Sequence, residues 1–154
     1  DPAPVHDDGV ALGVAPARRV SAHACIELLM SKNLGDRLVV QCFDTRALNY
    51  MHEKYPSIIY SYLVGEKVKD FDVYMSKLNF TPVWLSPHYT IVDEELVKKC
   101  KEMGIKLVPW TVDKPEDIKR MIDLKVEAII SNYPDRLIEQ TRGCLYEITK
   151  LKRK

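Results

Sequence analysis

The hydrophobic and polar positions of this sequence form a unit that repeats along the chain. Short apolar runs rich in β-branched and aromatic residues alternate with stretches in which apolar residues recur three and four positions apart. The apolar runs predict five strands, at residues 38–43, 58–64, 83–86, 106–113 and 126–131. Strands joined by helical crossovers of this length run parallel. The pattern therefore predicts an α/β fold with its functional residues at the carboxyl ends of the strands.

The starts of the helices are marked by residues that favour caps. Four aspartates stand before helical stretches and can accept hydrogen bonds from free backbone N–H groups: Asp44, Asp70, Asp93 and Asp113. An earlier helix is expected over residues 21–34, with Ser21 as its cap and with Cys25, Leu28 and Leu29 on one face. The helix from about Asp93 is expected to bury Leu96, Val97, Cys100 and Met103 and to end at Gly104, and Trp84 is expected in the core. The last helix is expected near Leu137.

Composition indicates one globular domain. The chain has 154 residues, of which 46% are hydrophobic and 29% charged, with a formal net charge of +1. We assign residues 21–150 to one domain that can bury a core, and residues 1–20, which hold prolines and glycines without any period, to a flexible lead-in. The near-neutral charge argues against nucleic acid as a partner. No apolar run approaches the roughly 18 residues that a membrane span needs.

The four cysteines do not suggest a metal or disulfide site. Cys25, Cys42, Cys100 and Cys144 are far apart and form no CxxC pair. We interpret them as small buried hydrophobic residues, with a disulfide framework or a zinc site as the less favoured alternatives.

Four segments carry a resemblance to a known family. They are Val40-Gln-Cys-Phe-Asp44, Leu85-Ser-Pro-His88, Val108-Pro-Trp-Thr-Val-Asp113 and Ala128-Ile-Ile-Ser-Asn-Tyr-Pro-Asp135. With these segments in order, residues 38–137 resemble the carboxyl-terminal part of the glycerophosphodiester phosphodiesterases, whereas residues 1–35 show no match. The resemblance implies a partial TIM barrel, whose five strands correspond to strands four to eight of a (β/α)8 barrel. It also implies hydrolysis of glycerophosphodiesters to glycerol 3-phosphate and an alcohol.

In that family the catalytic residues come from the first three strands. The resemblance implies a divalent metal, calcium or magnesium, held by carboxylates of a Glu-x-Asp pair and a Glu-x-Lys strand. It also implies two histidines, from a His-Arg-Gly turn and a His-Asp segment, that serve as acid and base. This sequence contains no His-Arg-Gly and no Glu-x-Lys. His6, in Val5-His-Asp-Asp8, resembles the His-Asp segment but lies too close to the first strand for the missing units, so we interpret it as a solvated loop residue. We therefore expect no catalytic residue and no metal ligand, and expect the chain to be inactive alone.

The remaining candidates would shape a substrate pocket. Trp110 lies at a strand end, where the family stacks an aromatic ring on the glycerol part of its substrate, and Phe43 also lies at a strand end. Core filling is the alternative for both rings. His88 follows a strand and could face a phosphate or be simply exposed. Asn132 could orient a ligand or cap the last helix.

Two positions depart from the family pattern. Cys42 stands where serine is usual, which replaces a good hydrogen-bond donor with a poor one. Lys125 stands where glycine is common. If that residue must adopt a positive φ to end the helix, lysine costs on the order of 1 kcal/mol there.

Five strands cannot close a barrel, so two sheet edges and part of the apolar interior would stay uncovered. The missing strands could come from another chain, two copies could associate through the open edges, or the sheet could flatten under the helix of residues 21–34. The alternative function that follows is a non-catalytic α/β module that binds or assembles through its open edge.

Overall fold

The computed structural model describes the backbone of residues 16–65 and 70–151, and the side chains of residues 23–65 and 70–142. Its centre is a parallel sheet of four strands in the order β1-β2-β3-β4. The strands are β1 (Val39–Cys42), β2 (Ile59–Val64), β3 (Trp84–Pro87) and β4 (Lys106–Leu107). The sheet is thus ordered as the chain is, as expected for successive β/α units of a barrel.

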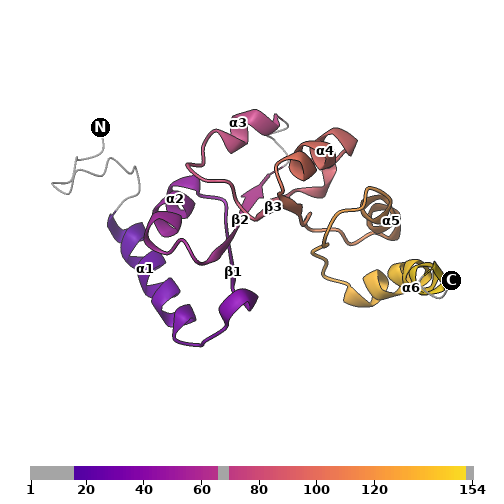
Figure 1. Cartoon of the computed structure of the whole chain (residues 1–154), viewed down its shortest axis with the longest axis horizontal. Coiled ribbons are helices and arrows are strands. Elements are labelled where there is room, and N and C mark those ends of the chain that lie inside the picture. Colours follow the sequence, from indigo (N-terminus) through magenta and orange to yellow (C-terminus); the bar gives the residue numbers. More distant parts are fainter. Residues whose placement is uncertain (1–15, 66–69, 152–154) are drawn as a thin grey trace.

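Helices follow the strands along one side of this sheet. They are α1 (Pro16–Met30), α2 (Thr45–Lys54), α3 (Phe71–Met75), α4 (Glu94–Glu102), α5 (Pro115–Asp123) and α6 (Pro134–Leu151), with short 3₁₀ turns at Gly35–Arg37 and Tyr89–Ile91. Figure 1 shows the helices in chain order along an arc, with the strands on its inner side. The expected α/β fold, a partial barrel of parallel β/α units, is confirmed.

Three of the four expected aspartate caps are confirmed. Asp44 accepts a hydrogen bond from the backbone N–H of Arg46, as Asp70 does from Asp72 and Asp93 from Leu96. These side chains satisfy N–H groups that have no partner within a helix. The fourth expectation is wrong, because Lys114 is the N-cap residue of α5. The carboxylate of Asp113 instead accepts a hydrogen bond from the backbone N–H of Asn132.

The first helix differs from its predicted form. α1 begins at Pro16 and ends at Met30, so Ser21 lies inside it, not at its cap. Cys25 and Leu28 are exposed, whereas Ile26 is buried and belongs to the core cluster with Leu48 of α2. The neighbour that covers a helix decides which of its faces is buried, and an apolar stripe this weak could not indicate it.

The core lies between the outer side of the sheet and the helices. Residues of β2, β3 and β4 are buried there together with apolar residues of the helices. The largest fully buried side chains are Tyr60, Tyr74, Ile26, Leu48, Leu85, Leu107, Ile118 and Met121. Leu96, Val97 and Cys100 of α4 are buried as expected, whereas Met103, expected beside them, is exposed. Among the described cysteines none forms a disulfide, and Cys25 is exposed, contrary to expectation.

The fifth expected strand is an extended segment that is not assigned as a strand. The backbone N–H groups of Glu127 and Ala128 both donate to the Leu107 carbonyl, and that of Ile130 donates to the Pro109 carbonyl. The segment therefore runs beside β4 and its continuation. The N–H of Leu107, however, donates to the Glu127 carboxylate at 2.7 Å. A side chain thus occupies a place that a backbone carbonyl takes in a regular ladder.

Two left-handed residues end α4 and α5. Gly104 has φ of +70° after α4, as predicted, and Lys125 has φ of +59° after α5. Glycine adopts this conformation without steric cost, whereas a residue with a Cβ does not. Lys125 is also exposed and its backbone N–H donates to the Ile122 carbonyl. Its side chain therefore adds strain where glycine would not.

Replacing Lys125 by glycine is expected to stabilise the chain by about 1 kcal/mol, because the left-handed conformation then carries no Cβ penalty. Lys125→Ala is the matched control, since it removes the lysine side chain and keeps the Cβ. Urea denaturation of the three proteins measures the difference. A glycine variant no more stable than the alanine variant would contradict the strain at this position.

Candidate functional site

The three residues proposed from the sequence meet at the carboxyl ends of the strands. Phe43 directly follows β1, His88 follows β3, and Trp110 lies three residues beyond β4. The Phe43 and Trp110 rings pack edge to face with centroids 5.4 Å apart, and the rings of His88 and Trp110 do so at 5.2 Å. Trp110 is thus the centre of an aromatic edge formed by Phe43, His88 and Trp110.

Backbone hydrogen bonds hold this aromatic edge in place. The indole Nε1–H of Trp110 donates to the Ser86 carbonyl at 2.7 Å, and its backbone N–H donates to the Pro87 carbonyl at 3.1 Å. The backbone N–H of His88 donates to the Val64 carbonyl at 2.7 Å, which continues the pairing of β2 with β3. The ring orientations are therefore set by the sheet itself.

The ring of His88 uses one of its nitrogens within the chain. His88 Nδ1 lies 2.7 Å from the Thr90 hydroxyl oxygen. Nε2 is then the ring nitrogen that a ligand can reach, as a donor or an acceptor according to the tautomer. His88 is half-buried and Phe43 is 56% exposed, so the edge is open to a small molecule.

A polar line lies next to this edge, across three strands. The amide Nε2 of Gln41 donates to the Ser86 hydroxyl at 3.0 Å, and the hydroxyls of Ser61 and Ser86 are 2.6 Å apart. Both serines are fully buried. The line was not foreseen from the sequence, although a polar residue in the middle of each of three apolar runs was a signal for it. Each hydroxyl has a partner, as burial requires.

Alternation along the strands defines what we call the inner face of the sheet. Successive side chains of a strand point to opposite sides, so the residues two positions from the polar line share its side. The inner face comprises Val39, Gln41 and Phe43, Ile59, Ser61 and Leu63, and Trp84, Ser86 and His88. Trp84, expected in the core, is half-buried on this face, and the ammonium of Lys106 lies 5.3 Å from its ring centroid.

Asp113, in the loop between β4 and α5, connects this loop to the segment just before α6. Its carboxylate accepts hydrogen bonds from the Ser131 hydroxyl at 3.0 Å and from the backbone N–H and side-chain amide of Asn132 at 2.8 and 2.9 Å. Arg136 donates to the Asp113 carbonyl at 3.0 Å. Donation to the charged form lowers the pKa of Asp113, first from the Asn132 backbone, then from its side chain. Asn132 thus uses its amide to hold Asp113.

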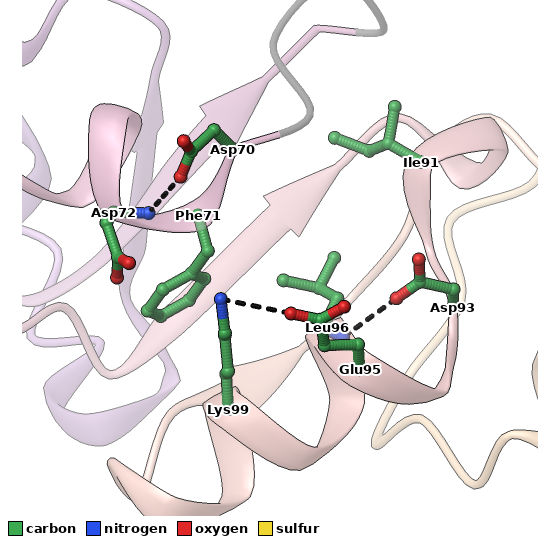
Figure 2. A pocket seen from close by; sticks show the side chains of 8 residues that line it. All are labelled: Asp70, Phe71, Asp72, Ile91, Asp93, Glu95, Leu96 and Lys99. Atoms are coloured by element: carbon green, nitrogen blue, oxygen red, sulfur yellow. Dashed lines mark hydrogen bonds and ion pairs between the residues drawn. The ribbon is translucent and has the colours of Figure 1, made fainter.

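An acidic hollow of about 310 Å³ lies between α3 and α4, and three of its four carboxylates have partners within the chain (Figure 2). Its lining is Asp70, Phe71, Asp72, Ile91, Asp93, Glu95, Leu96 and Lys99. Asp70 and Asp93 cap the two helices, and Glu95 lies 3.2 Å from Lys99. Asp70, Asp93 and Glu95 are therefore engaged in helix caps and an ion pair.

The residues that the structure describes do not fit the divalent ion that the resemblance implies. Among the described side chains, those of residues 23–65 and 70–142, no three or more His, Cys, Asp or Glu gather in a way that could hold a metal. The acidic hollow has the right ligand type without the geometry. His6 lies outside the described residues. No described helix is long and apolar enough to cross a membrane.

Comparison with known proteins matches one family. The model of the glycerophosphoryl diester phosphodiesterase family matches residues 10–136. The match begins well before Leu38, so the expectation that residues 1–35 lie outside the resemblance is wrong for residues 10–35. A glycerophosphodiester phosphodiesterase of Caldanaerobacter subterraneus subsp. tengcongensis is 31% identical over 117 residues, which are 76% of this chain and 47% of that protein.

Solved structures share the fold. A glycerophosphodiester phosphodiesterase from Parabacteroides distasonis superposes with a TM-score of 0.66 at 25% identity, covering 86% of this chain and 53% of the other. An Oleispira antarctica phosphodiesterase, in complex with the product sn-glycerol-3-phosphate, superposes with a TM-score of 0.69 at 20% identity and covers 81% and 50%. The chain spans about half the length of these relatives.

The hydrogen bonds to Asp113 predict an acid-sensitive stability. Because its pKa is lowered in the folded chain, Asp113 contributes stability fully above its ordinary pKa of 3.8 and loses it as pH falls through the lower folded value. Asp113→Asn should therefore lower the melting temperature at pH 7 and flatten its decline below about pH 4. Asp123→Asn, at an exposed carboxylate paired with Lys119, is the control. Equal acid profiles for the two variants would contradict this role of Asp113.

Proposed function

Because the chain belongs to the glycerophosphoryl diester phosphodiesterase family, we propose that it forms the carboxyl-terminal half of a barrel that hydrolyses glycerophosphodiesters to glycerol 3-phosphate and an alcohol. The observation that carries the proposal is the meeting of Phe43, His88 and Trp110 at the carboxyl ends of parallel strands, within the matched residues. In (β/α) barrels this end of the strands carries the chemistry.

The aromatic edge is suited to the glycerol part of such a substrate. The faces of Trp110 and Phe43 offer apolar contact to the carbon chain, and their edge-to-face packing keeps both rings fixed before a ligand arrives. The Nε2 of His88 can meet a hydroxyl or a phosphoryl oxygen beside them. The product bound in the Oleispira antarctica protein, sn-glycerol-3-phosphate, has both parts: a short polyol and a phosphate.

We assign the catalytic residues of the proposed reaction to the other half of the barrel, to which this chain does not correspond. Proteins of this family depend on a metal, which neutralises phosphoryl charge when bound. The described residues hold no set of ligands for it. We assign to this chain the binding and orientation of the substrate only, and no catalytic residue. In this proposal the isolated chain is inactive.

The isolated chain is expected to release no glycerol 3-phosphate from glycerophosphocholine, with calcium or with magnesium, because the acid, the base and the metal ligands lie elsewhere. Enzyme-coupled detection of glycerol 3-phosphate measures this, with the Caldanaerobacter protein as positive control. Metal-dependent release above the blank by the purified chain would show that catalytic groups are present after all.

Binding of sn-glycerol 3-phosphate by the isolated chain is expected to be weak, with a dissociation constant on the order of 1 mM, since only one wall of the site is present. The two tryptophans of the chain provide a matched pair. Trp110→Ala should abolish binding followed by NMR chemical-shift changes, whereas Trp84→Ala, near the opposite ends of the strands, should not. Thermal unfolding checks that both variants fold. Unchanged binding by Trp110→Ala would exclude the aromatic edge as the site.

A further inference from the structure

The turn that follows β3 begins at His88 and has few hydrogen bonds of its own. His88 precedes the 3₁₀ turn Tyr89–Ile91, and the backbone N–H of Ile91 donates to the His88 carbonyl at 3.1 Å. The next bond of the turn, from the N–H of Val92 to the Tyr89 carbonyl, is long at 3.3 Å. Short 3₁₀ turns have poorer hydrogen-bond geometry than α-helices. Contacts from outside the turn therefore decide where its residues lie.

Arg120 of α5 supplies such contacts. Its half-buried guanidinium donates from Nη1 to the Val92 carbonyl and from Nη2 to the Tyr89 carbonyl, each at 2.8 Å. Both bonds are shorter than the turn's own bond to the Tyr89 carbonyl, and their donor is charged, which strengthens them. The planar fork of a guanidinium can hold two carbonyls in a fixed geometry. Arg120 therefore clamps the two ends of the turn to α5.

This clamp reaches His88 through Thr90. Thr90 lies between the two carbonyls that Arg120 holds, and its hydroxyl oxygen is 2.7 Å from His88 Nδ1. A fixed partner on one ring nitrogen sets both the orientation of an imidazole and its tautomer. The same turn is bound to Trp110, because the backbone N–H of Tyr89 donates to the Trp110 carbonyl at 3.0 Å. Arg120 thus holds the segment that carries one ring of the aromatic edge and contacts the backbone of another.

We propose that Arg120 is a positioning residue of the aromatic edge: it holds the turn so that Thr90 fixes the His88 imidazole and leaves Nε2 for a ligand. This role rests on the proposed function only in taking Nε2 as the atom that meets the substrate. The positioning itself uses hydrogen bonds within residues 88–120, all of them described. A purely stabilising role of Arg120 would lower the melting temperature of a variant and leave the His88 tautomer unchanged.

Nitrogen-15 NMR of the imidazole reads the His88 tautomer directly in the full chain, and the spectrum of His88→Gln identifies its signal. Arg120→Met removes the donors and keeps an apolar stem, whereas Thr90→Val removes only the hydroxyl at the ring. Lys119→Met, which removes a neighbouring cation of α5 that pairs with Asp123, is the control. We expect Arg120→Met and Thr90→Val to change the tautomer of His88 in the same direction, and Lys119→Met to leave it as in the parent.

A His88 signal in Arg120→Met identical to that of the parent would overturn the proposal, even if the melting temperature falls. An equal change in Lys119→Met would overturn it too. If Arg120→Met does not fold, Arg120→Lys takes its place, because lysine keeps the charge and lacks the planar fork. The same change of the His88 signal is then expected, and its absence contradicts the clamp.

Titration with sn-glycerol 3-phosphate, followed by NMR chemical-shift changes, connects the positioning to the site. The dissociation constant should be about tenfold higher for Arg120→Met than for the parent, and unchanged for Lys119→Met. Equal affinity of Arg120→Met and the parent would overturn the role of Arg120 at the site. Absence of binding by the parent would contradict the proposed function instead, and the His88 tautomer would still decide whether Arg120 positions the ring.

Discussion

A parallel sheet needs both of its faces covered by other parts of the protein, and the structure of this chain depends on that requirement. The helices meet that need on the outer face, where Tyr60, Leu85 and Leu107 are almost fully buried. On the inner face the need is met only in part, by the polar line of Gln41, Ser61 and Ser86 and by the side chains around it. A closed barrel would cover the part of β1 that is exposed here. The chain matches about half the length of the known proteins, which agrees with this view.

The site and the open face are two regions of one surface. Phe43 belongs to both, because it packs on Trp110 at the strand ends and is exposed on the inward side of β1. In the barrel that we propose, the strands beyond β1 would therefore complete the wall around the aromatic edge. Phe43 therefore links the aromatic edge to the open side of β1, whereas His88 and Trp110 lie beyond β3 and β4.

Several expectations from the sequence failed where a tertiary contact competed with a local one. Asp113 had the position of a helix cap, but the hydroxyl of Ser131 and two N–H donors of Asn132 take its carboxylate. The fifth strand had the apolar pattern, but the Glu127 side chain takes the Leu107 N–H from the ladder. A local pattern cannot rank these alternatives, since the competing hydrogen-bond partners lie about twenty residues away along the chain.

The sequence by itself determined the β/α order, four of the strands, three aspartate caps and the left-handed end of α4 at Gly104. These features depend on hydrophobic period and on residues whose preference is local. It also placed Phe43, His88 and Trp110 at strand ends, which in a parallel sheet lie at one edge. Only the tertiary structure decided that the three rings touch, that Ile26 and not Cys25 is buried, and that β1 is open. Each of these depends on which distant segment packs against a residue, and a pattern along the chain does not contain that information.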